Sequence, residues 1–387
     1  MSGYDAIVVG AGSVGVPTAY FLQEKGFNVL CLDRLPSSGQ GQNKAAIGGV
    51  RATHSDPAKI KICQESLDIF SSWEERTGFN IGWKKGGYCF PVYRENEGNI
   101  LKSILPIQKK FSLNIDWVDG DRIQEKVPGI NPRDLLGGTY SPDDGQVSPL
   151  LAIAGFTSEA KRLGTEFRYN ETVTGVMVEE DSVKGVRTDC GEYHADVVVN
   201  TAGARATDIC SMAGLDVPVV PDSHEAGITS PVKPFLDPLV VDLRPGAEGK
   251  TANFYFGQVL SGQIIFCYTP IKPMVGEDRR CTSEFMPVIA KRLTDLIPRF
   301  KNLLVRRLWR GLYPMTPDGV PVLGTTGKLE GFYMAVGMCG QGFMLGPGVG
   351  RNLSELIAHG KPLLDSEIFE MLSPDRDYYR ERKEMLK

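Results

Sequence analysis

Residues 4–15 decide the fold: they read Tyr4-Asp5-Ala6-Ile7-Val8-Val9-Gly10-Ala11-Gly12-Ser13-Val14-Gly15. The apolar run predicts a buried strand, and the turn after it has the pattern Gly-x-Gly-x-x-Gly. A helix is predicted to Lys25, and a second strand over 28–32 ends on Asp33. Strand, glycine turn, helix, strand and acid, in this order, are the dinucleotide-binding fingerprint.

Each glycine of this fingerprint, and the acid that follows it, has a physical role. Gly10 permits the tight turn, Gly12 lets the backbone approach a pyrophosphate, and Gly15 lets the helix and the strand pack closely. The free N–H groups at the helix start face an anion at the positive end of the helix dipole. Asp33 is placed to accept hydrogen bonds from a ribose hydroxyl.

The composition excludes several classes of protein. A chain of 387 residues suggests two domains, and a net charge of −4 argues against a nucleic-acid partner. No apolar run approaches the ~18 residues of a membrane span, and the first strand begins too early to leave room for a signal peptide. The 8 cysteines form no C-x-x-C pair and do not cluster with the 4 histidines. We therefore expect a reduced cytoplasmic protein without a transmembrane segment or a bound metal.

The rest of the chain predicts that nucleotide-binding elements return twice. Asp56-Pro57 opens a helix that Gly78 ends, another helix is predicted over 149–163, and short strands follow over 166–199. A strand over 331–336 and a helix over 349–358 come last, before a charged tail at 375–383 that is typical of a solvated helix face. The expected fold class is α/β: a discontinuous Rossmann-like domain (1–85, 146–218 and 317–387) and a β-sheet-rich α+β domain (86–145 and 219–316).

Four blocks make the chain resemble a known family. They are residues 7–33, 45–51, 137–149, and 308–324 with a glycine-rich sequel to Gly348. In these blocks the chain is similar to the FAD-dependent D-amino-acid oxidase family, above all to glycine oxidases, sarcosine oxidases and proline dehydrogenase β-subunits. The resemblance covers nearly the whole length. It implies that the first domain binds FAD and the second binds the substrate.

The resemblance also implies how FAD is held. The N–H groups before and within the start of the last helix would stabilise negative charge at the N1/O2 edge of the flavin. Gly311 stands where sarcosine oxidases attach the flavin through Cys, so we expect non-covalent binding. The residues expected at the cofactor are Gly10, Gly12, Ser13, Val14, Gly15, Asp33, Arg34, Gln42, Asn43, Ala46, Ile47, Gly48, Val173, Ala202, Gly203, Gly311, Gly340, Gln341, Gly342, Phe343 and Met344.

The reaction that the resemblance implies is hydride transfer from the α-carbon of a neutral amine to flavin N5, which gives an imine. Such a step needs positioning more than an acid–base residue. Arg holds a carboxylate through two parallel charge-assisted bonds. Arg51 stands where sarcosine-oxidase-like chains place a substrate-binding Arg; the alternative is a structural Arg bonded to loop carbonyls.

Three positions depart from the relatives. Tyr313 replaces an Arg of glycine oxidase, and Met344 replaces a Lys of monomeric sarcosine oxidase, so the second carboxylate ligand is missing in both forms. Met344 suggests a bulkier or cyclic secondary amine, and Tyr313 is either a hydroxyl donor or an apolar wall. Ile265 takes the place of the Lys that activates oxygen in monomeric sarcosine oxidase, which favours a dehydrogenase over an oxidase.

Four more side chains are candidates. Tyr255 and Tyr268 are pocket walls, unless the alternation of their strands turns either one into the core. His54 would act as the base if the substrate were a 2-hydroxy acid or a glycerol phosphate. For His54 and His224, a structural role is the simpler interpretation.

The expected partner is therefore a small amino acid or amine. A homo-oligomer or a hetero-oligomer remains open, including a flavin-carrying β-subunit that is active only in a hetero-complex. NAD in place of FAD is disfavoured, because a single fingerprint accompanies the glycine-rich C-terminal block.

Overall fold

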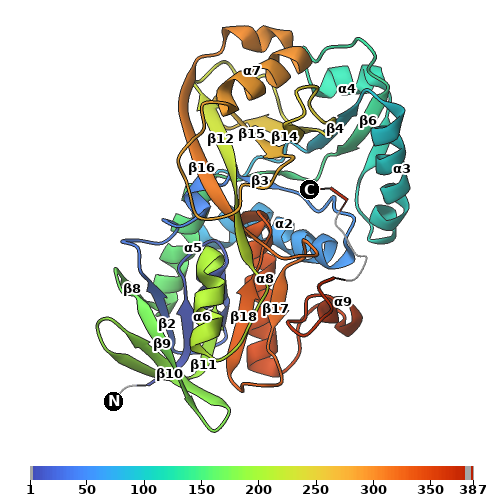
Figure 1. Cartoon of the computed structure of the whole chain (residues 1–387). Helices are drawn as coiled ribbons and strands as arrows, with labels where there is room; N and C mark the ends of the chain where they lie inside the picture. The colour runs from blue at the N-terminus through green and yellow to red at the C-terminus, as the bar shows by residue number, and fades with distance from the viewer. Residues whose placement is uncertain (1–2, 380–384, 387) are drawn as a thin grey trace.

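Two eight-stranded sheets dominate the fold (Figure 1). The computed structural model describes residues 3–379 and 385–386. In the view of Figure 1 one sheet fills the lower half of the molecule and the other fills the upper half. A short third sheet, made of β3 (Gly49–Val50) and β7 (Gly145–Gln146), contains only these two strands.

The first sheet carries the glycine turn. Its strands are β1 (Tyr4–Val9), β2 (Val29–Asp33), β8 (Glu166–Tyr169), β9 (Val173–Glu179), β10 (Ser182–Thr188), β11 (Glu192–Asn200), β17 (Val322–Gly324) and β18 (Phe332–Val336). The order is β17-β18-β11-β1-β2-β8, and β10 and β9 continue from β11 as an antiparallel meander. The centre is parallel, with β1 between β2 and β11, which confirms the predicted Rossmann-like α/β fold.

Both faces of this sheet are covered, as a parallel sheet requires. The helices α1 (Gly15–Glu24), α5 (Pro149–Leu163), α8 (Gly342–His359) and α2 (Pro57–Thr77) pack together on one face, and α6 (Ala206–Met212) lies with the meander on the other. Residues of β1 alternate between the two: Ala6 and Val8 join the first core, and Ile7 and Val9 join the second.

The second sheet forms the other half. Its strands are β4 (Tyr88–Val92), β5 (Asp116–Val118), β6 (Gly137–Ser141), β12 (Val220–Thr229), β13 (Leu239–Asp242), β14 (Thr251–Gln258), β15 (Ile264–Pro270) and β16 (Val305–Met315), in the order β16-β12-β15-β14-β13-β4-β6-β5. All its pairs are antiparallel except β4 with β13. Its helices are α3 (Glu95–Lys110), α4 (Gly120–Lys126) and α7 (Phe285–Leu296).

The alternation of side chains divides this sheet as well. Phe254, Phe256 and Phe266 pack in one core with Phe285 of α7. Tyr255, between two of these residues, points to the opposite face, toward the first domain's side of the sheet. The face away from α7 is therefore the one that lines the cavity described below.

Two predicted helices test the sequence patterns. The helix α2 begins as predicted: the Asp56 side chain accepts hydrogen bonds from two backbone N–H groups of its first turn, and Gly78 ends the helix at φ +73°. The last helix, α8, begins at Gly342 rather than at Val349. Gly346 and Gly348 lie inside this helix, where the backbones of neighbouring segments approach closely. A Cβ atom added at either position would come within 1.9 or 2.3 Å of a neighbouring backbone oxygen, so only glycine fits there. Close helix packing, invisible to propensity, explains this difference.

The described C-terminal part of the chain contains little regular structure after α8. A short helix, α9 (Ser366–Glu370), follows α8, and residues 375–379 form turns rather than a helix. Residues 380–383 of the charged tail lie outside the described residues. The strands of the two sheets fall within the two predicted sets of domain segments, and the exact domain boundaries stay a prediction. Within the described residues, no helix has the length and apolar character needed to cross a membrane.

Candidate functional site

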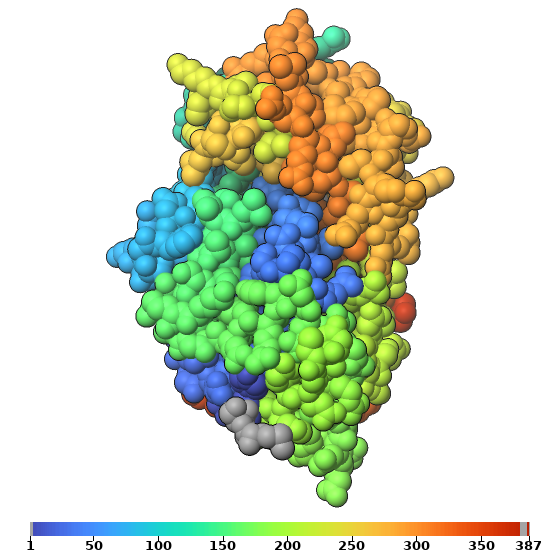
Figure 2. All heavy atoms as spheres, turned by 90° about the vertical axis from the view of Figure 1, so that its left-hand side faces the viewer, coloured from blue at the N-terminus to red at the C-terminus, as the bar shows by residue number. Residues whose placement is uncertain are grey.

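A large cavity of about 1070 Å³ lies where the two halves meet. In the space-filling view, blue atoms of the N-terminal part of the chain reach the surface between green and orange segments from later in the chain (Figure 2). The cavity wall combines the glycine turn, residues 33–49, residues 201–205, the inner face of the second sheet, and residues 338–344. Segments far apart in sequence therefore form one site.

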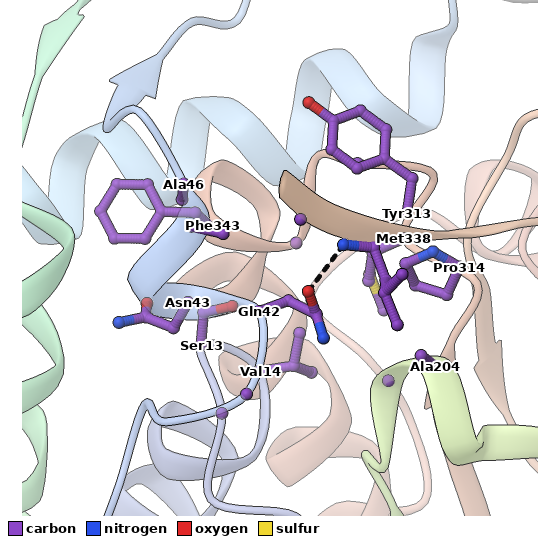
Figure 3. A pocket seen from close by; sticks show the side chains of 18 of the residues that line it. Ser13, Val14, Gln42, Asn43, Ala46, Ala204, Tyr313, Pro314, Met338 and Phe343 are labelled. Atoms are coloured by element: carbon purple, nitrogen blue, oxygen red, sulfur yellow. Dashed lines mark hydrogen bonds between the residues drawn. The ribbon is translucent and has the colours of Figure 1, made fainter. Parts of the chain in front are cut away.

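The glycine turn shapes the lower end of the cavity. Gly10 takes φ +109°, and a Cβ at Gly15 would lie 1.8 Å from the Gly10 carbonyl oxygen. A Cβ at Gly12 would meet no protein atom within 4 Å, although Gly12 lines the cavity. Ser13 and Val14 line it too (Figure 3). Gly15 does not, so its predicted place at the cofactor is corrected to a packing role behind the turn.

Asp33 at the end of β2 fixes the neighbouring backbone. Its carboxylate oxygens accept hydrogen bonds of 2.8 Å from Ala11 N and from Leu35 N. Burial raises the pKa of this carboxyl, while the two backbone bonds and Arg34 oppose that shift. Asp33 and Arg34 both line the cavity.

The loop after β2 forms one side of the cavity. Gln42 Oε1 accepts a hydrogen bond from Leu312 N at 2.7 Å, which ties the loop to β16 (Figure 3). Asn43 donates through Nδ2 to Pro149 O, and its Oδ1 has no partner in the described part of the chain. Other residues of the predicted cofactor set that line the cavity are Ala46, Ile47, Gly48, Val173, Ala202, Gly203 and Gly311.

The glycine-rich C-terminal loop completes the opposite side. Gly340 takes φ +80° and packs its Cα against the ring of Tyr313. Gln341 is the N-cap of α8, so the N–H groups of the first turn point toward the cavity that Gly342, Phe343 and Met344 line. The positive end of this helix therefore lies at the cavity wall.

Arg51 follows β3 and lines the cavity, but its terminal nitrogens are engaged. Nη1 donates to Thr53 O, and Nη2 donates to Leu386 O at 2.6 Å. The structure thus shows the loop-carbonyl alternative for Arg51 in this conformation. The Arg51 guanidinium also lies in the field of Asp144, a buried carboxyl whose pKa burial raises to about 6.

A polar cluster faces the cavity from the second sheet. Tyr255 and Tyr313 join their hydroxyls at 3.0 Å, and the His224 ring lies 3.9 Å from the ring of Tyr313. His224 Nε2 is 3.7 Å from Asp222 Oδ2. Burial raises the pKa of both tyrosines well above the usual value, so their hydroxyls stay protonated and can donate. Burial likewise raises the pKa of the adjacent Cys267 thiol to about 12.

Besides Gly15, two predicted residues, Tyr268 and His54, are not among the described residues that line the cavity. Tyr268 packs on Phe285 at 5.0 Å between ring centroids, because its neighbours on β15, Cys267 and Thr269, take the cavity side. His54 is fully buried, with Nε2 at 3.5 Å from Cys63 Sγ. Arg51 lines the cavity and His54 does not, although only two residues separate them in the sequence.

Sequence reasoning missed Lys59 and treated His224 as structural. Lys59 is 0% exposed and lines the cavity, yet its Nζ has no hydrogen-bond partner in the described part of the chain. The signal was present: Lys59 lies four residues before Cys63, on the apolar stripe of α2. Lysine is rarely fully buried without a partner, so a lysine on a buried helix face indicates a candidate functional residue.

Four buried polar atoms that line the cavity lack partners among residues 3–379 and 385–386. They are Asn43 Oδ1, Lys59 Nζ, His224 Nδ1 and Gln341 Oε1. An unsatisfied buried polar group costs about 1–3 kcal/mol, so a ligand that formed hydrogen bonds to these atoms would remove that cost. In the same described ranges no three His, Cys, Asp or Glu side chains are placed to hold a metal.

The comparisons with known proteins agree with this geometry. The family model described as "FAD dependent oxidoreductase" matches residues 5–356. Human mitochondrial dimethylglycine dehydrogenase is 25% identical over 93% of this chain and 43% of its own length, and 4-methylaminobutanoate oxidase of Paenarthrobacter nicotinovorans is 25% identical over 94% and 45%. The chain therefore spans less than half the length of these curated relatives.

Other relatives match over most of their length. The β subunit of sarcosine oxidase from Rhodobacter capsulatus is 24% identical over 94% of this chain and 87% of its own. The crystal structure of L-proline dehydrogenase from P. horikoshii superposes with a TM-score of 0.90 at 31% identity, over 96% of this chain and 97% of that one. Glycine oxidase from Bacillus cereus gives 0.81 at 25% identity, over 92% and 96%.

Proposed function

Because the chain belongs to the family of FAD-dependent oxidoreductases, we propose that it oxidises an amino acid to the corresponding imine, with a secondary or N-substituted amine favoured. The single observation that carries this proposal is the cavity. It joins a dinucleotide-binding turn to a wall with Arg51, Tyr255 and Tyr313. The L-proline dehydrogenase and the sarcosine oxidase β subunit support a secondary amine, since those names describe such substrates.

The residues present fit FAD. The open position at Gly12 leaves room for a pyrophosphate, and the carboxylate of Asp33 is placed for a ribose. The unpartnered Asn43 Oδ1 and Gln341 Oε1 offer acceptors to N–H groups of a ligand. We infer non-covalent binding at Gly311, which carries no nucleophile and whose added Cβ would lie 2.8 Å from Ala45 Cβ.

When bound, FAD supplies the two-electron acceptor for oxidation of the amine. The chain's own part is to position and to exclude water. The rings of Tyr313 and His224 and the buried face of β14 and β15 wall the site, and Arg51 is the proposed ligand of the substrate carboxylate. For that role, Arg51 Nη2 must either exchange its hydrogen bond to Leu386 O for one to the substrate, or donate to both acceptors at once.

The proposal extends to the electron acceptor of the enzyme, to its assembly with other chains and to its location in the cell. Ile265 is buried on β15 where the sequence predicts the oxygen-activating position, so we favour a dehydrogenase. The match to 87% of a sarcosine oxidase β subunit supports a hetero-complex as an alternative to a chain active alone. The eight free cysteines support a reducing, cytoplasmic location.

The test is anaerobic bleaching of the flavin absorbance with pairs of amines that differ only in the carboxylate: proline against pyrrolidine, and N-methylglycine against dimethylamine. We expect the acid of at least one pair to bleach the flavin and its carboxylate-free partner to fail. Arg51→Met should remove this discrimination. Bleaching by glycerol phosphate or a 2-hydroxy acid, but by no amine, would contradict the proposal. Admission of air then separates oxidase from dehydrogenase by the rate at which the colour returns.

A further inference from the structure

Lys59 is a lysine of the cavity wall, and no salt bridge or hydrogen bond to its Nζ is found in the described part of the chain. Its side chain is 0% exposed. It lies in the first turn of α2, at the positive end of the helix dipole, where a cation is unfavourable. Burying an ammonium without an anion costs several kcal/mol. A bound anion would remove this cost.

The acidic residues of the cavity wall are committed elsewhere. Asp33 accepts two backbone hydrogen bonds, Asp222 lies beside His224, and Glu171 accepts a bond from Thr188. The two that remain, Asp208 and Glu277, both pair with Arg205. The wall therefore offers Lys59 no free carboxylate, and the anion must come from a ligand.

The position of Lys59 points to the substrate end of the cavity. The helix α2 contacts β3, and Arg51 follows β3 directly, so the two cations enter the cavity from the same part of the fold. Both terminal nitrogens of Arg51 already donate to carbonyls, whereas Lys59 Nζ has three free donors. Met344, at the start of α8, supplies no charge to this region.

We propose that Lys59 binds the substrate carboxylate together with Arg51, one cation to each carboxylate oxygen. This inference rests on the proposed function and adds to it a second residue that binds the carboxylate of the amino acid. The second carboxylate ligand that Tyr313 and Met344 fail to supply thus comes from a different element, α2.

The experiment measures binding to the oxidised holoenzyme by calorimetry, with no turnover. The probes are pyrrole-2-carboxylate and its uncharged isostere pyrrole-2-carboxamide. In Lys59→Met we expect the carboxylate to bind about 10- to 100-fold more weakly, the loss typical of a charged hydrogen bond, and the carboxamide to change less than about threefold. Lys59→Arg should restore part of the carboxylate affinity.

The control is Lys61→Met, on the same helix, because Lys61 Nζ lies over the Phe111 ring rather than in the cavity. It should change neither affinity. A structural lysine would lose stability on substitution, whereas Lys59→Met should unfold at the same temperature as the wild type or higher, since it removes an unpaired buried charge.

Three outcomes would overturn the proposal. One is an unchanged ratio of carboxylate to carboxamide affinity. Another is a changed flavin affinity or reduction potential with unchanged carboxylate affinity, which would assign Nζ to the cofactor. The third is a Lys59→Met chain that fails to fold. Failure of every amine to bleach the wild-type flavin would instead count against the proposed function, because probe binding does not depend on turnover.

Discussion

Arg51 Nη2 donates a hydrogen bond of 2.6 Å to the backbone carbonyl of Leu386, 335 positions later in the chain. The Leu386 side chain is 2% exposed and packs with Tyr88 and Phe90, which also line the cavity. A neutral carbonyl thus holds a donor that a carboxylate would bind more strongly. Substrate and Leu386 should therefore compete for Arg51.

The first prediction follows from this competition. Leu386→Ala removes most of the apolar side chain that seats the carbonyl, a loss of about 2–3 kcal/mol when the side chain is fully buried. We expect KM for the amino acid to fall about three- to tenfold with little change in kcat, because a weaker competitor raises only the affinity. Leu363→Ala, at a side chain that is 49% exposed, is the control. An unchanged or raised KM would show that Leu386 does not compete.

The second prediction separates two glycines of the same turn. Gly15→Ala places a Cβ 1.8 Å from the Gly10 carbonyl oxygen, so the apoprotein should lose about 3 kcal/mol or more of unfolding free energy. Gly12→Ala meets no protein atom within 4 Å and should leave the apoprotein unchanged. It should, however, weaken FAD binding by about tenfold or more, because the methyl group enters the cavity.

Thermal unfolding of the apoproteins and fluorescence titration with FAD measure the two effects. Gly327→Ala is the control, since a Cβ there also meets nothing within 4 Å and Gly327 is outside the cavity wall. Equal loss of FAD affinity in Gly327→Ala and Gly12→Ala would contradict the assignment of the turn.

The third prediction concerns Asp144 and pH. Burial raises its pKa from 3.8 to about 6, so the folded chain binds this proton more tightly than the unfolded chain does. Its contribution to the free energy of unfolding is therefore largest below about pH 4, falls as the pH rises to about 6, and is constant above that. Asp144→Asn should remove this fall.

The measurement is the unfolding temperature of the apoprotein from pH 4 to pH 8, compared between wild type and variant. Asp143→Asn is the matched control. A hydrogen bond from Lys85 lowers the pKa of Asp143, so its stabilising contribution is present above pH 4 and is lost only as the pH falls further. A parallel pH profile for wild type and Asp144→Asn would refute the assignment.

The fourth prediction tests the runner-up reaction. The His54 side chain is fully buried, with Nε2 at 3.5 Å from Cys63 Sγ, so a substitution there disturbs the packing of α2. His54→Gln should lower the unfolding temperature and change kcat for the amine by less than about threefold, since general-base catalysis contributes about 100-fold or more where it operates. A collapse of turnover at normal flavin content would instead favour oxidation of an alcohol.

The local pattern around residues 4–33 was sufficient to predict the first domain. An apolar strand, the spacing of Gly10, Gly12 and Gly15, and the terminal Asp33 each act through neighbouring atoms, so the sequence predicts them well. Helix α2, with its Asp56 cap and terminal Gly78, is predicted for the same reason. The residues expected at the cofactor beyond this turn were inferred from the resemblance; all of the expected set except Gly15 line the cavity, and their contact with the cofactor stays a prediction.

The substrate end depended on tertiary structure, because its side chains come from elements without local signals for one another. Only the register of β14 and β15 decides that Tyr255 enters the cavity while Tyr268 packs on α7. Only the packing of α2 brings Lys59 to the cavity, and only the return of the chain end places Leu386 on Arg51. The sequence by itself determined the fold and the glycine turn, because both depend on local patterns; long-range packing decided which charged side chains line the cavity.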